Sequence, residues 1–491
     1  MATALSHHEL EVRSREQVFI GGAWVDPAGD GVIEIVNPAT EDVAATVPDP
    51  TPADAERAVA AARAAFDDGA WPRMAAAERA AAIGRLADEL EARSDEIDRA
   101  FTVATGSPLL HSPAMQQMAV AQWRDWARLA ADVTVEEERR VAGGTVRVRR
   151  EPAGVALGIL PWNGPQPLAA FKVGAALSAG CTVVLKPAPE EPLTSYLLAE
   201  AVEAAELPPG VVNVIAGGRE LGETLVGHPG VDKVAFTGSV EGGRRVMSLC
   251  ADRIARVTLE LGGKSAAVLA DDVDLAQVLP TLVPGGVGHC GQVCIALTRI
   301  LAPRSRYGEI VDALGAAFSA IRVGDPLDPE TEMGPLALER QRARVEEYIA
   351  VGRSEARLVA GGGRPAGLDR GWYVEPTLFA DVDNRSRIAQ EEVFGPVVVV
   401  IPYDDDADAV RIANESRYGL SGAVYSADPE RALTIARQIR TGTVSINASG
   451  ICTTQPFGGY KRSGIGREGG PEGLAAYQEV KQMHLPDPAG A

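Results

Sequence analysis

Short apolar segments alternate with helical segments over residues 155–260, and this alternation constrains the fold more than any other feature of the chain. Strands are predicted at 155–160, 182–185, 211–215, 233–236 and 256–260, and helices at 165–179, 193–205, 220–226 and 242–250. Apolar strands that alternate with helices favour a parallel, doubly wound sheet, which binds ligands at the carboxyl ends of its strands.

A second alternation follows, with strands predicted at 266–269, 298–301, 397–401, 423–425 and 444–446, and helices at 306–321, 340–351, 407–414 and 429–439. This pattern predicts a second α/β domain. A chain of 491 residues is too long for one ordinary core, so two or three domains are expected.

Between these regions and the N-terminal helices, residues 145–149 alternate polar and apolar side chains, which is typical of a half-exposed strand. An exposed strand of this kind must be covered. We interpret residues 133–150 as an oligomerisation arm that a partner subunit covers. The alternative is an ordinary hairpin within one subunit.

Composition narrows the function. The chain has 47 Lys and Arg against 67 Asp and Glu, and this net charge of −20 disfavours nucleic acid and anionic membranes as partners. No apolar run reaches the ~18 residues of a membrane span, and residues 1–15 lack the apolar core of a signal peptide. The odd number of cysteines, five, favours a reducing cytoplasm, and the six histidines form no zinc-type pair, so no metal is expected.

Three residues offer the groups that oxidise a carbonyl through a covalent thioester. Cys294, in CGQVC, is a candidate thiol nucleophile. Glu260, in LELGGK, is a candidate base, and Asn163, in PWN, is a candidate amide donor for an oxyanion. A cysteine alone is more often a buried structural residue, but this combination favours a catalytic role for Cys294.

A candidate nucleotide site comes from the segment FTGSVEGG at 236–243, which follows a predicted strand and opens a predicted helix. Its glycines allow the backbone to approach a pyrophosphate, although by spacing alone a structural turn is the better reading. Lys186, at the end of another strand, is a candidate for binding ribose or phosphate, or else a solvated charge. Glu392 and Phe394 offer a carboxylate for a ribose and a ring for a nicotinamide, or else belong to a structural loop.

Taken together, the chain resembles the aldehyde dehydrogenase superfamily from about Phe19 to Lys481. The motifs that carry the resemblance are PWN (161–163), VVLKPA (183–188), VAFTGS (234–239), LELGGKS (259–265), GQVC (291–294), EEVFGPV (391–397) and PFGGYKRSG (456–464). The resemblance implies a Rossmann-like dinucleotide-binding domain at 1–128 and 151–262, a catalytic domain at 263–467, and a small β arm at 129–150 and 468–491 that builds a homodimer or homotetramer.

The resemblance also assigns roles by position. Cys294 matches the nucleophile, Glu260 the general base, Asn163 the oxyanion donor, and Lys172 a lysine near the base. The positions that match cofactor contacts are Trp162, Lys186, Gly238, Ser239, Gly243, Leu261, Glu392 and Phe394. The implied reaction is oxidation of an aldehyde to its carboxylic acid with NAD, with hydrolysis of a thioester rather than transfer to coenzyme A.

The chain departs from the family pattern at several positions. Pro189 stands where many members have a glutamate that binds the adenosine ribose, and Glu190 comes one residue later. We favour NAD because Glu190 can reach back and no added Arg or Lys is visible near Lys186, but NADP is not excluded. His289 is interpreted as structural, and Cys290 is a hypothetical disulfide partner for Cys294 under oxidation.

The substrate tunnel is predicted from Gly164, Leu168 and Phe171 on one side and from Gly450, Ile451 and Cys452 on the other. These residues are small or apolar and include no Arg or Lys. We therefore expect a hydrophobic aldehyde: aromatic, terpenoid or medium-chain. The alternatives are an NADP-dependent or acid-semialdehyde dehydrogenase and, more remotely, a non-catalytic binding protein on the same fold.

Overall fold

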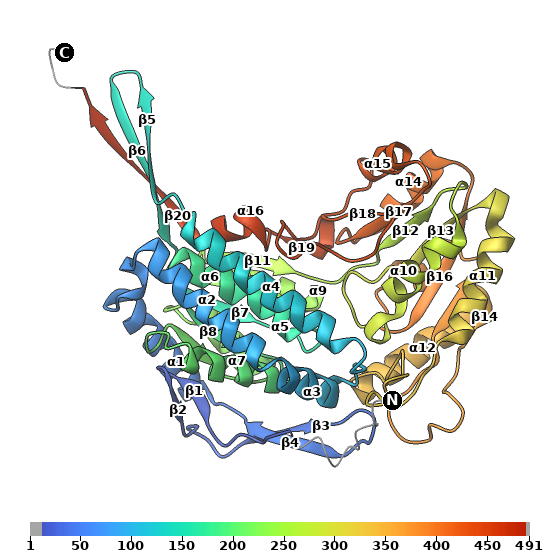
Figure 1. The fold of residues 1–491 in the computed structure, drawn as a ribbon, viewed down its shortest axis with the longest axis horizontal. Coiled ribbons are helices and arrows are strands. Elements are labelled where there is room, and N and C mark those ends of the chain that lie inside the picture. Colours follow the sequence, from blue (N-terminus) through green and yellow to red (C-terminus); the bar gives the residue numbers. More distant parts are fainter. Residues whose placement is uncertain (1–11, 488–491) are drawn as a thin grey trace.

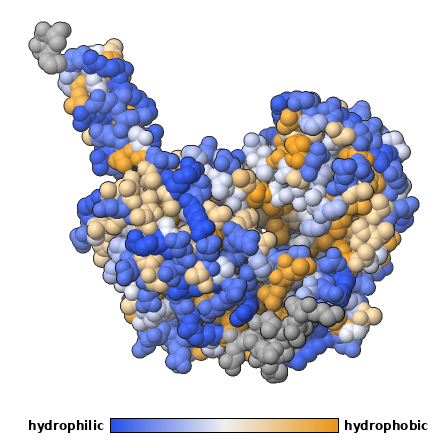
Figure 2. All heavy atoms as spheres, in the orientation of Figure 1, coloured by the Kyte–Doolittle hydropathy of each residue, from blue (hydrophilic) through white to orange (hydrophobic). Residues whose placement is uncertain are grey.

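A computed structural model describes residues 12–487. Residues 1–11 and 488–491, the outer ends of the predicted cofactor domain and arm, lie outside the described residues. Two large sheets with helices on their faces form the body, and a narrow arm projects from it (Figure 1). The surface is hollowed between this arm and the part that carries the second sheet (Figure 2).

The larger sheet has eight strands in the order β19-β11-β10-β7-β8-β9-β1-β2. Its strands are β1 (Val18–Ile20), β2 (Ala23–Val25), β7 (Val155–Ile159), β8 (Thr182–Lys186), β9 (Val212–Val214), β10 (Lys233–Thr237), β11 (Arg256–Glu260) and β19 (Gly464–Ile465). From β7 the chain adds β8 and β9 on one side, then returns to add β10 and β11 on the other, all in parallel. A ligand crevice is expected where the strand order reverses, at the carboxyl ends of β7 and β10. The predicted α/β fold with a Rossmann-like sheet is confirmed.

Alternate residues of each strand point to opposite faces of this sheet, so both faces carry apolar side chains, and helices cover both faces. Val155, Leu157 and Ile159 pack in one apolar cluster, and Ala156 packs in the other. The helices are α1 (Pro52–Asp67), α2 (Ala76–Ala92), α3 (Ser94–Thr105), α4 (Ser112–Ala131), α7 (Leu193–Ala204), α8 (Arg219–Gly227) and α9 (Val240–Ala251). A separate two-stranded sheet pairs β3 (Val32–Val36) with β4 (Val43–Pro48).

The predicted helix at 165–179 is in fact three segments: α5 (Pro165–Ala169), a π-helical turn (Ala170–Gly174) and α6 (Ala175–Ala179). A π turn inserts one residue into the helix and changes which side chains share a face. Here the turn contains Phe171 and Lys172, both buried. The predicted helical span is therefore confirmed, with a π turn where two predicted site residues lie.

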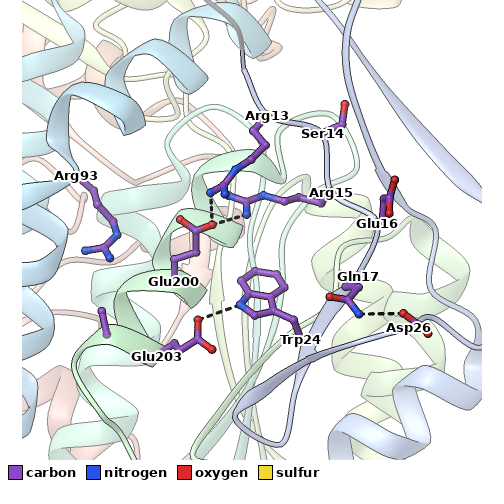
Figure 3. A pocket seen from close by; sticks show the side chains of 11 residues that line it. Arg13, Ser14, Arg15, Glu16, Gln17, Trp24, Asp26, Arg93, Glu200 and Glu203 are labelled. Carbon is purple, nitrogen blue, oxygen red and sulfur yellow. Dashed lines mark hydrogen bonds and ion pairs between the residues drawn. The ribbon is translucent and has the colours of Figure 1, made fainter.

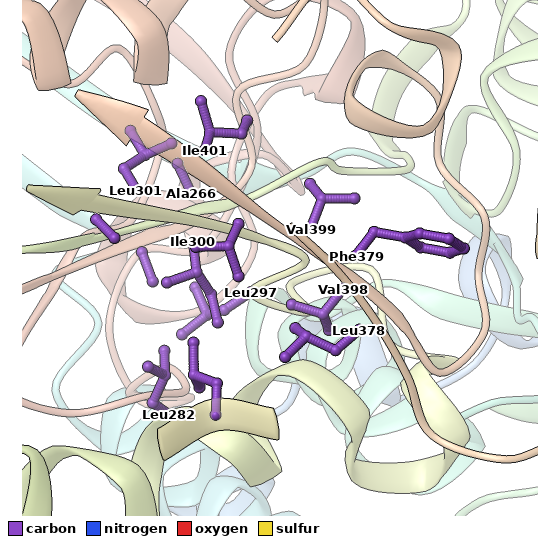
Figure 4. Packing of buried hydrophobic residues seen from close by; sticks show 14 of the residues in the cluster. Ala266, Leu282, Leu297, Ile300, Leu301, Leu378, Phe379, Val398, Val399 and Ile401 are labelled. Atoms are coloured by element: carbon purple, nitrogen blue, oxygen red, sulfur yellow. The ribbon is translucent and has the colours of Figure 1, made fainter. Parts of the chain in front are cut away.

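The second sheet has seven strands in the order β14-β15-β16-β13-β12-β17-β18, and side chains from β12, β13, β15 and β16 pack together with side chains from α10 in its core (Figure 4). Its strands are β12 (Ala266–Leu269), β13 (Arg299–Pro303), β14 (Arg357–Ala360), β15 (Thr377–Ala380), β16 (Val397–Tyr403), β17 (Gly422–Tyr425) and β18 (Ser445–Ile446). Its helices are α10 (Leu275–Val287), α11 (Tyr307–Ala320), α12 (Glu339–Glu355), α13 (Arg387–Gln390), α14 (Asp406–Asn414) and α15 (Pro429–Ala436). Sequence analysis missed β14, β15 and α10.

The arm consists of β5 (Glu136–Val141), β6 (Gly144–Pro152) and β20 (Gln478–Pro486), in the order β20-β6-β5. The predicted strand at 145–149 lies within β6 and pairs with β5 as a hairpin within the chain. β20 covers the other edge of β6, and α16 (Gly470–Ala475) joins it to the body. Val480 is 66% exposed, so the arm has apolar surface to bury. Of the helices within residues 12–487, none is long and apolar enough to cross a membrane.

Arg299, at the start of β13, joins several segments of the second α/β unit. It is 2% exposed and donates hydrogen bonds to the carbonyls of Lys264, Ile412 and Ala413 and to the Asn384 side chain, at 2.9–3.0 Å. At the other end of the strand, Arg304 forms an exposed ion pair with Asp404.

We expect Arg299→Met to destabilise the fold by about 3–5 kcal/mol, because it leaves buried acceptors without donors. The control, Arg304→Met, removes an exposed ion pair and should cost less than about 1 kcal/mol. Thermal denaturation of both variants gives the comparison. Equal melting temperatures for the two variants would contradict this account of Arg299.

Candidate active site

The carboxyl ends of the central strands bring the predicted site residues to one edge of the larger sheet. Asn163 follows β7, and Lys186 ends β8 beside Ile159. Glu260 ends β11 opposite Thr237 of β10. The parallel register therefore sets the spacing of these groups, which lie at the reversal of strand order.

Cys294 lies on a loop that leaves the second α/β unit and reaches Asn163. The loop begins with His289, Cys290 and Gly291 in the left-handed region, at φ of 49°, 56° and 67°. The Asn163 Nδ2 donates to the Gln292 carbonyl at 2.8 Å. An amide nitrogen carries two protons, so Asn163 keeps a second donor beside the loop of Cys294.

The Cys294 thiol is half-buried among apolar side chains. It packs with Ile295 against a cluster formed by Phe171, Leu420 and Phe457, and the Phe171 and Phe457 rings stack at 5.6 Å. Burial, and then the carboxylates of Glu392 and Glu260, raise the pKa of Cys294 to about 12, while the backbone amides of Ile295 and Cys294 lower it. The thiol is thus protonated at neutral pH in the free protein.

Glu260 is 1% exposed, and neither carboxylate oxygen has a hydrogen-bond partner among the described residues. Burial and the neighbouring Glu468 carboxylate raise its pKa well above the usual range, and Lys172 opposes this shift. Lys172 Nζ contacts Glu468 Oε1 at 2.7 Å and donates to Thr237 Oγ1 at 2.6 Å. Glu260 therefore keeps its proton to higher pH than an ordinary carboxyl group does, and it lies beside a buried ion pair.

Sequence analysis assigned Glu468 no chemistry, and the structure places it against the predicted base. Phe457, Ile295 and Leu420 were also missed, although they surround Cys294. Glu468 follows an ordinary-looking Gly-Arg pair, and no local pattern marks it. Its burial depends on an ion pair with a residue 296 positions away.

The predicted nucleotide site is a real cleft. A cavity of about 430 Å³ lies at this edge of the sheet, and its wall includes Lys186, Ser239 and Gly242. Ser239 caps α9 by accepting from the Gly242 amide at 3.1 Å. An added Cβ would lie 2.6 Å from the Phe236 ring at Gly238 and 2.5 Å from Leu261 at Gly243, so a larger residue at either position would have to displace that side chain.

Lys186 is 5% exposed, and burial lowers its pKa to about 8. Its ammonium donates to the carbonyls of Pro187 and Gly217, which leaves one of its three protons for a ligand. Glu190 lines the same cleft as Lys186 and pairs with Arg340, and Arg219 also lines the cleft. The expectation that no added Arg or Lys lies near Lys186 was therefore wrong.

Glu392 and Phe394 lie on a loop that touches both α/β units. Glu392 Oε1 accepts from the Gly263 amide at 3.1 Å, and burial raises its pKa to about 7. Phe394 has a φ of 61° and meets the Trp162 ring edge-on at 5.6 Å. This arrangement places the predicted nicotinamide contacts between the two units.

The predicted tunnel residues separate into two groups. Leu168, Phe171 and Ile451 belong to the apolar cluster around Cys294. Gly164 is buried at the start of α5, while Gly450 and Cys452 are exposed and lie outside that cluster.

His289 and Cys290 have structural contacts. The His289 ring lies 5.4 Å from Phe101 and 6.4 Å from Trp162, and burial lowers its pKa to about 4. The Cys290 thiol donates to the Gly334 carbonyl at 3.0 Å. Both cysteines are free, and the disulfide of Cys290 with Cys294 stays a hypothesis.

Another cavity, of about 810 Å³, lies where the N-terminal segment meets α7 and contains none of the predicted site residues (Figure 3). Arg13 and Arg15 both pair with Glu200, and Trp24 donates to Glu203. Each of these contacts therefore joins side chains that line the cavity to one another. Among the described residues, no three His, Cys, Asp or Glu side chains gather as metal ligands.

Comparison with known proteins gives a consistent result. The family model described as "Aldehyde dehydrogenase family" matches residues 24–483. The chain is 48% identical to geranial dehydrogenase of Castellaniella defragrans over 96% of this chain and 98% of that protein.

Two solved structures are also similar. An aldehyde dehydrogenase of Mycobacterium tuberculosis in complex with NAD+ has a TM-score of 0.95 and 47% identity, covering 98% of this chain and 99% of that one. A variant of aldehyde dehydrogenase C from Pseudomonas syringae, in complex with NAD+ and octanal, has a TM-score of 0.92 and 40% identity, covering 95% and 96%. The predicted family is confirmed.

The electrostatics of Cys294 predict its reactivity. In the free protein at pH 8, iodoacetamide should modify Cys294 much more slowly than the exposed Cys452, and its rate should rise with pH because only the thiolate reacts. Glu392→Gln removes a carboxylate that raises the thiol pKa, so alkylation of Cys294 at pH 9 should become about threefold faster. Mass spectrometry of each peptide measures both rates.

Glu391→Gln is the matched control. Glu391 accepts hydrogen bonds from Tyr348 and Arg387 and is not among the groups that shift the pKa of the Cys294 thiol. Alkylation of Cys294 as fast as Cys452 at pH 8 would contradict the raised pKa.

Proposed function

The chain belongs to the aldehyde dehydrogenase family, whose members are NAD(P)-dependent oxidoreductases acting on aldehydes, and we propose that it oxidises an apolar aldehyde to its carboxylic acid with NAD+. The observation that carries this proposal is the apolar cluster around Cys294, with Asn163 and Glu260 at the adjoining strand ends. NAD+ is proposed because the similar solved structures hold it.

The residues present fit a dinucleotide. The 430 Å³ cavity has the size of a ligand pocket, and the N-terminus of α9 together with Gly238 and Gly243 suits a pyrophosphate. Lys186 has a proton left for ribose hydroxyls, and Glu392 with Phe394 would hold the nicotinamide end. When bound, the nicotinamide ring supplies the acceptor for a hydride from the substrate carbon.

The chain's own residues carry the covalent chemistry. The Cys294 thiolate forms a bond to the aldehyde carbon, and the carbonyl oxygen becomes an alkoxide. Asn163 and the Cys294 amide donate hydrogen bonds to that alkoxide, and loss of one such donor typically costs about 10²–10³ in rate. Departure of the hydride leaves a thioester on Cys294.

Glu260 then takes a proton from water as the water attacks the thioester, which releases the acid and restores the Cys294 thiolate. Glu260 accepts this proton only in its ionised form, which burial disfavours. The Lys172–Glu468 pair lies next to it: Glu468 raises the pKa of Glu260 further and Lys172 lowers it. We therefore assign Lys172 and Glu468 positioning roles.

A hydrophobic substrate suits the cluster of Leu168, Phe171, Ile451 and Phe457. Two of the relatives point the same way, since one is named for geranial and another was solved with octanal. An acid semialdehyde would need a cation to bind its carboxylate, which these four side chains do not offer.

We further propose that the arm pairs with a second copy of the chain. Within residues 12–487, the outer edges of β5 and β20 pair with no other strand, and open sheet edges of this kind are normally covered. A homodimer or homotetramer in a reducing cytoplasm follows from the sequence predictions and fits the free cysteines.

Cys294→Ala should form no NADH, whereas Glu260→Gln should form about one equivalent of NADH per site and then stall, because the thioester accumulates. Rapid-mixing absorbance and intact mass measure the burst and the acyl adduct. Cys452→Ala, which removes an exposed thiol, is the control and should keep full activity. Steady turnover by Cys294→Ala would rule out the thiol mechanism.

The pH dependence of thioester hydrolysis should follow Glu260. Its raised pKa means that hydrolysis is slow at low pH and rises as pH passes that pKa. Glu468→Gln removes a like charge, so it should move this rise to lower pH, while Glu468→Asp should keep it near that of the parent protein. Single-turnover acid release between pH 5 and 9 gives the profile; an unmoved profile in Glu468→Gln would contradict the positioning role.

Substrate preference distinguishes a dehydrogenase of apolar aldehydes from a dehydrogenase of acid semialdehydes. We expect kcat/KM for octanal and geranial to exceed that for succinic semialdehyde by at least about tenfold, because burying a carboxylate without a partner is costly. Ile451→Arg should narrow that ratio. A preference of the parent protein for succinic semialdehyde would overturn the apolar assignment.

A further inference from the structure

An ion pair joins the cofactor cleft to the second α/β unit. Glu190 lies on the loop after β8 and lines the cleft, and its carboxylate pairs with the guanidinium of Arg340 in the first turn of α12. The Glu190 side chain is 20% exposed and that of Arg340 is 67% exposed. The pair therefore lies at the rim of the cleft.

The backbone of α12 that presents Arg340 is held firmly. Gln341 Nε2 donates to the carbonyls of Val393 and Phe394, at 3.0 and 2.7 Å, and Arg344 Nη2 donates to the Glu392 carbonyl at 2.7 Å. One helix thus fixes the loop of Glu392 and Phe394 and carries the partner of Glu190. Arg340 is held on the same side of the cleft as that loop.

The Glu190–Arg340 pair changes the balance of charge around the cleft. The wall carries three basic and three acidic residues: Lys186, Arg219, Arg245, Glu190, Glu223 and Glu241. Glu223 is paired with Arg245, and Arg340, from outside the wall, neutralises Glu190. Arg340 therefore tips the balance of the cleft toward positive, with Arg219 and Lys186 as further cations.

We propose that Arg340 is a specificity-determining residue for the cofactor: by holding Glu190 it removes a carboxylate from the adenosine ribose and admits a 2′-phosphate, so that the protein binds NADP+ as well as NAD+. This proposal rests on the proposed function. A 2′-phosphate adds up to two negative charges, which a free carboxylate at the rim would repel. Pro189 offers no charge of its own in place of Glu190.

The Glu190–Arg340 ion pair predicts in which direction each substitution should change the affinities for NADP+ and NAD+. Arg340→Ala releases Glu190, which can then accept from ribose hydroxyls and repel a phosphate. Affinity for NADP+ should fall, and affinity for NAD+ should hold or rise. Adding Glu190→Gln removes the released charge, so the double variant should return toward the parent's ratio of affinities.

Isothermal titration of the full-length protein with NAD+ and with NADP+ tests the proposal. The parent should bind both, and Arg340→Ala should raise the ratio of Kd for NADP+ to Kd for NAD+ by about tenfold. The double variant should restore the ratio. Arg353→Ala, at the far end of the same helix and bonded only to the Gly362 carbonyl, is the matched control and should leave the ratio unchanged.

An unchanged ratio in Arg340→Ala, or an equal loss of affinity for both nucleotides, would overturn the specificity role and leave only a structural tie between the units. A ratio that stays raised in the double variant would show that Glu190 is not the group through which Arg340 acts. A parent protein that binds neither nucleotide would instead refute the proposed function itself. The kcat/KM values for aldehyde oxidation with each nucleotide should follow the Kd ratio.

Discussion

The buried ion pair between Lys172 and Glu468 is the interaction on which the site depends. It joins the π turn before α6 to the segment before α16, and Lys172 also donates to Thr237, whose register partner is Glu260. A carboxylate without a hydrogen bond, such as that of Glu260, is expensive to bury unless it takes a proton or lies near a cation. Lys172 of the pair supplies the cation, while the Glu468 carboxylate raises the pKa of Glu260. In the resting site, the two carboxyl groups of Glu260 and Glu468 therefore lie near one lysine.

A second constraint comes from α12, which links the two ends of the proposed cofactor site. Its side chains bind three successive carbonyls of the 392–394 loop and hold Phe394 at a positive φ, which a bulky residue adopts only when its surroundings impose it. The same helix carries the partner of Glu190. A shift of α12 would therefore disturb the nicotinamide end and the adenosine end together.

Sequence patterns predicted the parts of the fold that local chemistry determines. The central parallel strands of both sheets and most helices between them were predicted within a few residues. Lys186 was singled out because it stands where a strand ends, and Asn163 and Glu260 because of the motifs that contain them. The missed elements have weaker local signals. β14 and β15 are short, and α10 contains Pro280 and Pro284, which oppose a helix. The roles of Glu468 and Arg340 depend on contacts across 296 and 150 residues, which no local period reveals.

The surroundings of Cys294 suit a hydrophobic substrate but oppose ionisation of the thiol. Apolar side chains suit a hydrophobic aldehyde, but they also make the thiol hard to ionise, and Glu392 and Glu260 add to that effect. The groups that favour the thiolate are the backbone amides of Cys294 and Ile295, and the Cys294 amide is also one of the donors proposed for the alkoxide. The charge on sulfur and the later charge on oxygen are thus stabilised by overlapping sets of donors. A site built in this way keeps its nucleophile unreactive toward solvent electrophiles and develops charge only where donors are already in position.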